Sequence, residues 1–335
     1  MARVAYFYRE MSEYIEIDLR ALRERHEVSV TGAPTRWPRP LDTWRRVAGA
    51  DVVMSWFASW HALLPALFAR LLRKPFVIVV GGYDTACLPG IDYGHQRGGL
   101  RALVARAVLR LATTVVAISP FTQRELRELG VPADRTVLLP LGLDPDRYAS
   151  DAPRDPALVV TTGGVQRGNL TRKGHEAFVR AAALVPEARF VLIGAWMDDA
   201  IERLAEIATP NVTFTNRLSH ASKVDWLTRA AVVVQASQHE AFGLSLAEGM
   251  LCGAVPVVTR AGALPWVAGG TGVVVDSQEP AELARAIRAA LALPAEAHGA
   301  ARARVLGEFT VSARAAGLEA LLAGGAPAAA PARAA

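Results

Sequence analysis

The chain has 335 residues, 52% of them hydrophobic, which is enough for two domains with sizeable cores and excludes wholesale disorder. A net charge of +5 suits anionic ligands, but the basic residues are scattered and no nucleic-acid-binding motif is present, so we expect no nucleic-acid partner. Two distant cysteines, no signal-peptide pattern and no stretch of about 20 apolar residues predict a cytoplasmic protein.

The first 150 residues alternate short apolar runs with amphipathic segments. Apolar runs predict strands at residues 4–7, 27–31, 51–55, 75–80, 114–119 and 137–140. Helical spacing predicts a helix that ends near residue 25 and further helices at residues 98–111 and 121–129. This alternation predicts a doubly wound α/β domain with a parallel sheet. No Gly-x-Gly-x-x-Gly follows the first strand, which argues against a dinucleotide-binding dehydrogenase.

Two loops of this half follow the carboxyl ends of strands, where parallel sheets usually bind ligands. His61 comes shortly after strand 51–55, and Gly81 and Gly82 directly follow strand 75–80. The paired glycines imply a tight backbone or the close approach of a ligand. His61 is a candidate general base or acceptor contact, and the alternative is a hydrogen-bonded residue at the start of a helix.

The helix predicted at residues 98–111 is amphipathic and basic. Its apolar positions follow one stripe, made of Leu100, Leu103, Val104, Ala107, Val108 and Leu111. Its arginines lie away from that stripe, at positions 101, 106 and 110. One interpretation is a helix packed on the sheet with solvated arginines. The other is a helix that contacts the inner face of a membrane, which would make the protein peripheral.

The polar, proline-containing segment at residues 149–156, directly after residues 141–148, predicts an interdomain linker. We therefore expect a first domain at residues 1–150 and a second at residues 151–305. The Ala/Pro/Gly-rich tail at residues 323–335 is expected to be disordered. Asp144 and Asp146 form a D-x-D pattern, but the intervening proline favours a structural role, and we expect no metal site.

The second half repeats the alternation, with apolar runs at residues 158–162, 190–194, 212–215, 232–236 and 255–259. A glycine-rich loop at residues 163–174 carries Gly164, Arg167, Arg172 and Lys173. Such a loop between a strand and a helix, with basic side chains, suits a diphosphate. The chain has only three lysines, and Lys173 stands just before the glycine that starts the helix.

Residues 232–259 predict a strand, a helix and a second strand, with two carboxylates across the loop–helix junction. Glu240 and Glu248 are eight residues apart, and the helix begins between them, at Phe242, Gly243, Leu244 and Ser245. A helix N-terminus attracts phosphate through its unpaired N–H groups and its dipole. We expect the two carboxylates to flank such a phosphate and to hold sugar hydroxyls on either side.

The run Glu-Ala-Phe-Gly-Leu-Ser-Leu-Ala-Glu at residues 240–248, followed by Cys-Gly-Ala-Val-Pro-Val-Val, resembles the E-x7-E motif of the retaining glycosyltransferases of family 4. The resemblance implies the GT-B architecture of two facing Rossmann-like domains with a cleft, and a helix at residues 306–322 that crosses back to the first domain. It also implies transfer of a hexose from a UDP- or GDP-sugar to a small-molecule, lipid-linked or glycan acceptor. The resemblance further implies that the reaction retains the configuration of the anomeric carbon and needs neither a cofactor nor a metal ion.

The resemblance assigns roles to the charged residues. Lys173 and an arginine would grip the donor diphosphate, and Arg167 is the first choice for that arginine because the loop looks lengthened, with Arg172 the second. Glu248 would hold the ribose diol, and Glu240 would bind donor-sugar hydroxyls close to the reacting carbon.

Two further loops are assigned in the same way. Arg217 and Leu218, after strand 212–215, would frame the nucleotide base. Asp84 stands nearest to the position where the family often has a substrate-facing histidine. Its alternative is an Asx-type turn residue.

Two rival functions are compatible with the sequence. One is another enzyme on the same architecture, either a nucleotide-sugar epimerase or a sugar phosphorylase, the latter with a lysine Schiff base to pyridoxal phosphate. The other is a non-catalytic protein that binds nucleotide sugars, which would keep Lys173 and Glu248 but form no product.

Overall fold

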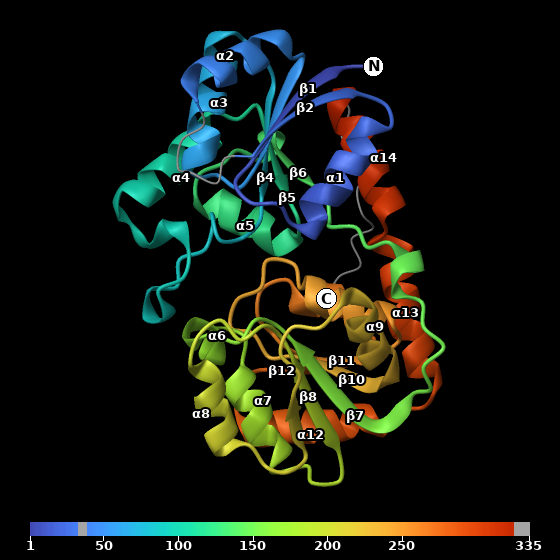
Figure 1. The fold of residues 1–335 in the computed structure, drawn as a ribbon. Helices are drawn as coiled ribbons and strands as arrows, with labels where there is room; N and C mark the ends of the chain where they lie inside the picture. Colours follow the sequence, from blue (N-terminus) through green and yellow to red (C-terminus); the bar gives the residue numbers. More distant parts are fainter. Residues whose placement is uncertain (33–38, 325–335) are drawn as a thin grey trace. The chain divides into compact units, whose positions relative to one another are not determined.

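The computed structural model describes residues 1–32 and 39–324, and its contacts divide the chain into two compact units (Figure 1). Unit 1 holds Met1–Gly142 and the last helix, α14 (Val311–Leu322), and unit 2 holds Leu143–Thr310. Most of the tail that we expected to be disordered, residues 325–335, lies outside the described residues.

Unit 1 is built on a six-stranded parallel sheet in the order β2-β1-β3-β4-β5-β6. Its strands are β1 (Arg3–Tyr8), β2 (Glu27–Gly32), β3 (Val52–Trp56), β4 (Phe76–Val80), β5 (Thr114–Ala117) and β6 (Thr136–Leu138). Its other helices are α1 (Glu13–Arg23), α2 (Pro40–Gly49), α3 (Trp60–Leu71), α4 (Gly99–Leu111) and α5 (Pro120–Glu128). The strand order reverses between β1 and β3, so the loops after these two strands meet at the switch point.

Unit 2 repeats this design with a second parallel sheet, in the order β12-β11-β10-β7-β8-β9. Its strands are β7 (Asp155–Thr162), β8 (Arg189–Ile193), β9 (Val212–Phe214), β10 (Ala230–Gln235), β11 (Val255–Thr259) and β12 (Val273–Val275). Its helices are α6 (Arg167–Arg172), α7 (His175–Ala182), α8 (Ala200–Ile207), α9 (His220–Arg229), α10 (Leu244–Leu251), α11 (Leu264–Ala268), α12 (Pro280–Leu291) and α13 (Glu296–Glu308). Valine-rich central strands such as β10 and β11 are buried on both faces, as parallel sheets require.

The predicted fold class, two doubly wound α/β domains, is confirmed by the two sheets. Three local predictions were wrong, the third only in part. The glycine-rich loop contains a short helix, α6, and the single last helix expected from residue 305 is instead α13 and α14, which separate at Phe309 and Thr310.

The third prediction, the apolar stripe of α4 packed on the sheet, was wrong in part. Val104 and Val108 of the stripe are buried, but Leu100 and Leu103 are 63% and 64% exposed. The helix buries Ala102, Ala105 and Leu109 as well, because the small alanines let it lie close to α3 and the sheet.

A buried ion pair fastens α14 to unit 1, where it lies beside α1 (Figure 1). The Arg314 guanidinium donates to both carboxylate oxygens of Asp18, at 2.9 and 2.8 Å, and to the carbonyl oxygen of Leu139 at 2.7 Å. Asp18 also accepts from the Trp56 indole at 2.9 Å. Both charged side chains are only 1% exposed, so each depends on the other for its charge to be compensated.

We predict that Asp18→Ala lowers the free energy of unfolding of unit 1 by about 3–5 kcal/mol, because it leaves the Arg314 guanidinium buried without a counter-charge. Replacing both partners, as Asp18→Leu with Arg314→Met, should recover much of that loss. Denaturant unfolding measures both effects. The matched control is Asp51→Ala, which breaks the exposed Arg3–Asp51 pair and should cost far less. Equal losses for Asp18→Ala and Asp51→Ala would contradict this view of the buried pair.

Candidate functional site

The centre of the candidate site in unit 2 is an ion pair between Lys173 and Glu240. The Lys173 Nζ donates to Glu240 Oε2 at 3.0 Å, and each side chain is only 16% exposed. Burial raises the pKa of Glu240, but the charges of Lys173 and Arg172 outweigh it, so the pKa lies below its usual value and the carboxylate stays ionised. Gln235 and Ser237 donate to the same oxygen at 3.3 Å.

Backbone geometry brings the two residues together. Lys173 ends α6, and Gly174 then adopts φ +70°. A Cβ at Gly174 would lie 2.1 Å from the carbonyl oxygen of Ala236, at the end of β10, so only glycine permits this approach. Gln278 ties the same segments, because its amide donates to the carbonyl oxygens of Thr171, at 2.8 Å, and of Ala236.

The predicted helix after Glu240 is confirmed as α10, and Gly243, with φ +99°, is its N-cap. Leu244 and Ser245 form the first turn and are partly exposed. N–H groups in the first turn of a helix have no partner within the helix. The Phe242 ring, at the predicted helix start, is buried and packs edge-on against Trp266 and Phe309, with centroids 6.1 and 5.3 Å away, and so anchors the loop.

Glu248 lies inside α10 and is buried, with two donors on one oxygen. The Tyr148 hydroxyl and the Lys223 Nζ both donate to its Oε1 at 2.7 Å. Tyr148 comes from the short 3-10 helix at Pro145–Tyr148, directly before the predicted linker, and Lys223 comes from α9. Neither residue was selected from the sequence, because Tyr148 and Lys223 stand 100 and 25 residues from Glu248 in the chain.

The structure separates the two candidate arginines. Arg167 is 75% exposed and pairs with Asp199, whereas Arg172 donates to Asn169 at 2.6 Å and acts electrostatically on Glu240. The first choice, Arg167, is therefore bound away from the ion pair, and the second choice, Arg172, is near it. Asn169 also donates to the carbonyl oxygen of Gly164 at 2.7 Å, which ties α6 to the glycine-rich loop.

The residues expected to frame the base are farther along the sheet. Arg217 and Leu218 follow β9, the edge strand that lies two positions from β7. Arg217 is exposed, and its backbone N–H donates to the Asn216 side chain at 2.7 Å. The turn is sharp because Asn216 has φ +57°, a conformation that asparagine tolerates.

A cavity of about 410 Å³ in unit 1 contains two of the first domain's candidates, His61 and Asp84. The Asp84 carboxylate is fully buried and accepts from the N–H groups of Ala58, Gly81 and Gly82 at 2.9–3.1 Å. Burial raises the pKa of Asp84 to about 6. This is a structural role but not an Asx turn, because the three donors precede Asp84 in the chain, whereas an Asx turn accepts from a residue that follows. The carboxylate holds the turn in which Gly82 has φ +98°.

His61 is also held by protein groups. Its ring is buried, and the Nε2 hydrogen-bonds the carbonyl oxygen of Trp56 at 2.7 Å. Burial lowers the pKa of His61 to about 4, so the ring is neutral near pH 7. The alternative of a hydrogen-bonded residue at a helix start describes this contact, since His61 is the second residue of α3.

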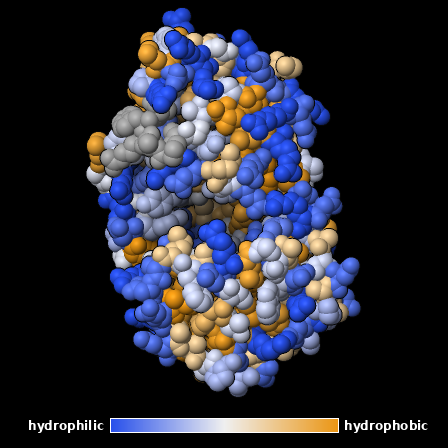
Figure 2. All heavy atoms as spheres, viewed as in Figure 1, coloured by the Kyte–Doolittle hydropathy of each residue, from blue (hydrophilic) through white to orange (hydrophobic). Residues whose placement is uncertain are grey.

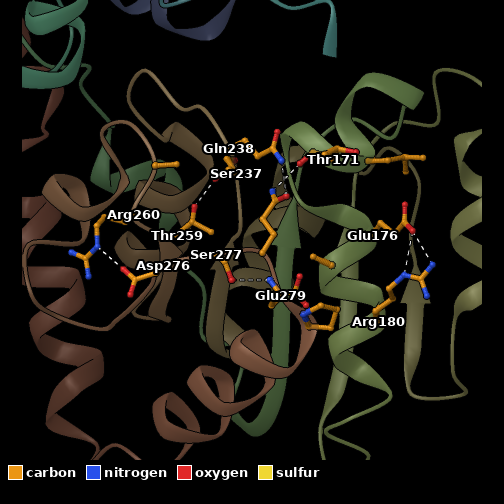
Figure 3. Close-up of a pocket in the computed structure, with 15 residues that line it drawn as sticks. Thr171, Glu176, Arg180, Ser237, Gln238, Thr259, Arg260, Asp276, Ser277 and Glu279 are labelled. Atoms are coloured by element: carbon orange, nitrogen blue, oxygen red, sulfur yellow. Dashed lines mark hydrogen bonds and ion pairs between the residues drawn. The ribbon is translucent and has the colours of Figure 1, made fainter. Parts of the chain in front are cut away.

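A cavity of about 810 Å³ in unit 2 is lined by Ser237, which also donates to Glu240, but neither Lys173 nor Glu240 lines it. Two ion pairs lie on opposite sides of this cavity: Arg260 with Asp276 at 2.7 Å, and Arg180 with Glu176 at 2.9 Å (Figure 3). Glu279 adds a further carboxylate to the lining. Because both arginines are paired and the lining holds more carboxylates than arginines, we place the anion site at Lys173 and α10 instead.

Within residues 1–32 and 39–324, no group of three or more His, Cys, Asp or Glu side chains is arranged to hold a metal ion. In the same residues, no helix is long and apolar enough to span a membrane. Hydrophobic residues occur in small groups among hydrophilic ones on the visible face of each unit (Figure 2).

The sequence matches two models of known protein families. A family model described as glycosyl transferases group 1 matches residues 157–292, and one described as a glycosyl transferase 4-like domain matches residues 9–142. Both halves of the chain thus match family models of glycosyl transferases. The family expected from the E-x7-E motif is thereby confirmed.

Curated relatives are distant and longer. The chain is 29% identical over 261 residues to a D-inositol 3-phosphate glycosyltransferase 1 of Catenulispora acidiphila, covering 69% of this chain and 61% of that protein. It is 27% identical over 214 residues to a GDP-mannose-dependent monoacylated α-(1-6)-phosphatidylinositol monomannoside mannosyltransferase of Corynebacterium glutamicum, covering 56% of each. The matches thus span little more than half of these relatives.

Solved structures share the fold over almost the whole chain. HepE of Anabaena in complex with UDP has a TM-score of 0.80 at 17% identity, with 96% of this chain and all of that chain covered. Sucrose-phosphate synthase of Thermosynechococcus elongatus has a TM-score of 0.77 at 20% identity, covering 97% and 99%. The GT-B architecture implied by the resemblance is confirmed.

Sequence reasoning missed His175, the first residue of α7. It is buried, and neither ring nitrogen has a hydrogen-bond partner among the described residues. Gly163 makes room for it, since a Cβ at that position would lie 3.1 Å from the ring Nε2 and 3.2 Å from Lys173 Cδ. Burial, with the charges of Lys173 and Arg172, lowers the pKa of His175 to about 3.

This lowered pKa predicts a pH dependence. An unfolded histidine binds its proton near pH 6.5 and the folded His175 does not, so its contribution to stability is present above pH 6.5 and is lost as the pH falls toward 3. Between pH 6.5 and 4.5, His175→Gln should therefore reduce the slope of unfolding free energy against pH by about 1.4 kcal/mol per pH unit. Urea unfolding at several pH values measures it, and parallel curves for the two proteins would show that the ring is protonated in the folded state.

Proposed function

We propose that this protein is a retaining glycosyltransferase that moves a hexose from a nucleoside diphosphate sugar to an acceptor without a metal ion. The observation that carries the proposal is the buried Lys173–Glu240 pair beside the N-terminus of α10. In this proposal unit 2 binds the donor and unit 1 binds the acceptor.

The chemical problem is charge. Breaking the glycosyl–phosphate bond leaves a diphosphate anion and a sugar with oxocarbenium character. Lys173, Arg172 and the N–H groups of Leu244 and Ser245 offer positive charge and hydrogen bonds to that anion, and each such preorganised donor contributes about 2.7–4 kcal/mol. A bound phosphate would compete for the Lys173 ammonium and release Glu240 Oε2 to accept from sugar hydroxyls.

Glu248 fits the ribose end of the donor. Both of its donors, Tyr148 and Lys223, bond to Oε1, and Oε2 takes part in none of its hydrogen bonds to the described residues. The second oxygen is therefore available to a ribose hydroxyl. Lys223 also offsets the cost of keeping this carboxylate charged while it is buried.

The donor base is proposed from relatives. HepE is described in complex with UDP, and the Corynebacterium relative is described as GDP-mannose-dependent, so UDP- and GDP-hexoses are the first donors to test. The exposed Leu100 and Leu103 beside Arg101 on α4 favour a lipid-linked acceptor held at a membrane surface, which flotation with anionic vesicles tests.

The rival functions fit less well. A phosphorylase of the pyridoxal phosphate type needs a neutral lysine amine, but Lys173 and Lys223 are both in ion pairs, and Lys74 precedes β4 at the amino end of its sheet. A binding protein without activity would keep the ion pair of Lys173 and Glu240 but would release no nucleoside diphosphate, so a turnover assay separates it from the proposed enzyme.

We predict that Lys173→Ala lowers kcat for release of nucleoside diphosphate from UDP-glucose or GDP-mannose by about 10²–10³-fold, with EDTA present throughout. Glu240→Gln should also cripple turnover, because the neutral amide cannot stabilise positive charge on the sugar. The control is Arg288→Ala, which breaks an exposed ion pair with Glu187 and should keep the wild-type rate. A near-wild-type rate for Glu240→Gln would remove its proposed role.

Nucleotide binding can be tested without an acceptor. UDP or GDP at 100 times its dissociation constant stabilises the folded protein by about 2.7 kcal/mol, enough to raise the thermal midpoint by a few degrees. We expect one of UDP, GDP, ADP and dTDP to do so in EDTA, and the shift to vanish in Lys173→Ala. A shift that needed added metal would contradict the metal-independent site.

A further inference from the structure

Phe57 has a strained backbone at the carboxyl end of β3. Its φ is +66°, a left-handed conformation that is rare for a bulky side chain. In the described chain only Arg73, Asp92 and Asn216 share it without being glycine, and Asp and Asn tolerate it. Such strain costs about 1–3 kcal/mol and persists only where the surroundings impose it, often at binding sites.

The surroundings of Phe57 do impose it. Its N–H donates to the carbonyl oxygen of Val79 at 2.8 Å, and the next N–H, of Ala58, donates to the buried Asp84 carboxylate at 2.9 Å. The ring lies over Gly81, where a Cβ would come within 2.0 Å of it. Asp84 and Gly81 therefore act together to turn the Phe57 side chain out of the strand and hold it.

The ring held in this way is one wall of the 410 Å³ cavity of unit 1. Phe57, Tyr14 and Tyr83 are each only partly buried, so aromatic surface faces the cavity from the first turn of α1 and from two loops. Tyr14 meets Phe57 edge-on at 6.3 Å, and Tyr83 meets His95 edge-on at 4.8 Å, so these contacts hold the rings in place. Aromatic surface that stays exposed in a concave site is suited to a ligand ring.

The polar groups of the cavity are mostly neutral. Burial lowers the pKa values of both His61 and His95, and the Asp84 carboxylate is occupied by backbone N–H groups. The Nδ1 of His95 is buried and has no hydrogen-bond partner among the described residues. The charged Arg9 pairs with Glu10 at 3.5 Å, and both are well exposed.

We propose that this cavity binds the acceptor through a six-membered ring stacked on Phe57, and that the strained Phe57 backbone exists to present that ring face. The ligand class is a neutral ring with an apolar face and hydroxyls: a cyclitol, a pyranose or an aryl group. The assignment rests on the proposed glycosyl transfer for the word acceptor, but ring binding itself can be measured without a donor.

The experiment is saturation-transfer NMR on the full-length protein without nucleotide. The probes are myo-inositol, methyl α-glucopyranoside and benzyl alcohol, which separate the three sources of a ring. Mannitol, with the same six carbons and six hydroxyls as myo-inositol but no ring, is the acyclic comparison. We expect saturation of at least one ring probe and at least tenfold weaker binding of mannitol.

Phe57→Gly keeps the backbone conformation and deletes the ring, and should weaken the ring probe about tenfold or more. Phe57→Tyr restores an aromatic face and should restore binding. Arg73→Gly is the matched control, because it also replaces a residue of positive φ (+55°) but does not line the cavity, and it should bind as wild type does. The nucleotide-induced thermal shift checks that each variant is folded.

Three results would overturn the proposal: mannitol binding as well as the ring probes, Phe57→Gly keeping full binding, or no ring probe binding to the wild-type protein. Failure of glycosyl transfer is read separately, in nucleotide release from UDP-glucose or GDP-mannose. A protein that binds rings but releases no nucleotide would keep the ring site and lose the proposed function.

Discussion

The buried pair of Lys173 and Glu240 is the constraint around which unit 2 is arranged. Two opposite charges removed from water are costly unless each has its partner, so the loops that carry them must be held to within a hydrogen-bond length. Gly174 and Gln278 provide this, since both bring the end of α6 against the carbonyl oxygen of Ala236. In the proposed site, Glu240 compensates the charge of Lys173 when no ligand is bound. A bound phosphate would take the place of Glu240 as the partner of Lys173.

The sequence predicted the parts of this site that are local in the chain. Glu240 and Glu248 lie eight residues apart across one loop and one helix, so their placement follows from the strand–helix–strand pattern. Arg167 was preferred to Arg172 because the loop looked lengthened. The helix α6 within it sends Arg167 to Asp199 instead. Spacing along a loop does not determine which side chain a short helix turns inward.

Contacts between distant segments could not be predicted in this way. The Tyr148 hydroxyl reaches Glu248 across 100 residues, and Arg314 reaches Asp18 across 296. His175 follows a motif residue directly, yet only the packing of Gly163 shows that its ring is buried. The prediction for α4 was wrong in part for a related reason. Periodicity gives the apolar positions of a helix, but it does not show that Ala102 and Ala105 face α3 and the sheet while Leu100 and Leu103 face outward.

The candidate site of unit 2 and the cavity of unit 1 manage polarity in different ways. The site of unit 2 keeps partly buried charges paired near a helix N-terminus, which suits a site where negative charge develops on a leaving phosphate. In the cavity of unit 1, the Nε2 of His61 is bound to Trp56, and Asp84 is held by N–H groups. In the proposed reaction, a leaving phosphate that takes the proton of the acceptor would make a protein base unnecessary, so unit 1 would need only to orient a hydroxyl. The partly exposed aromatic side chains of its cavity and the strained Phe57 are consistent with that proposed task.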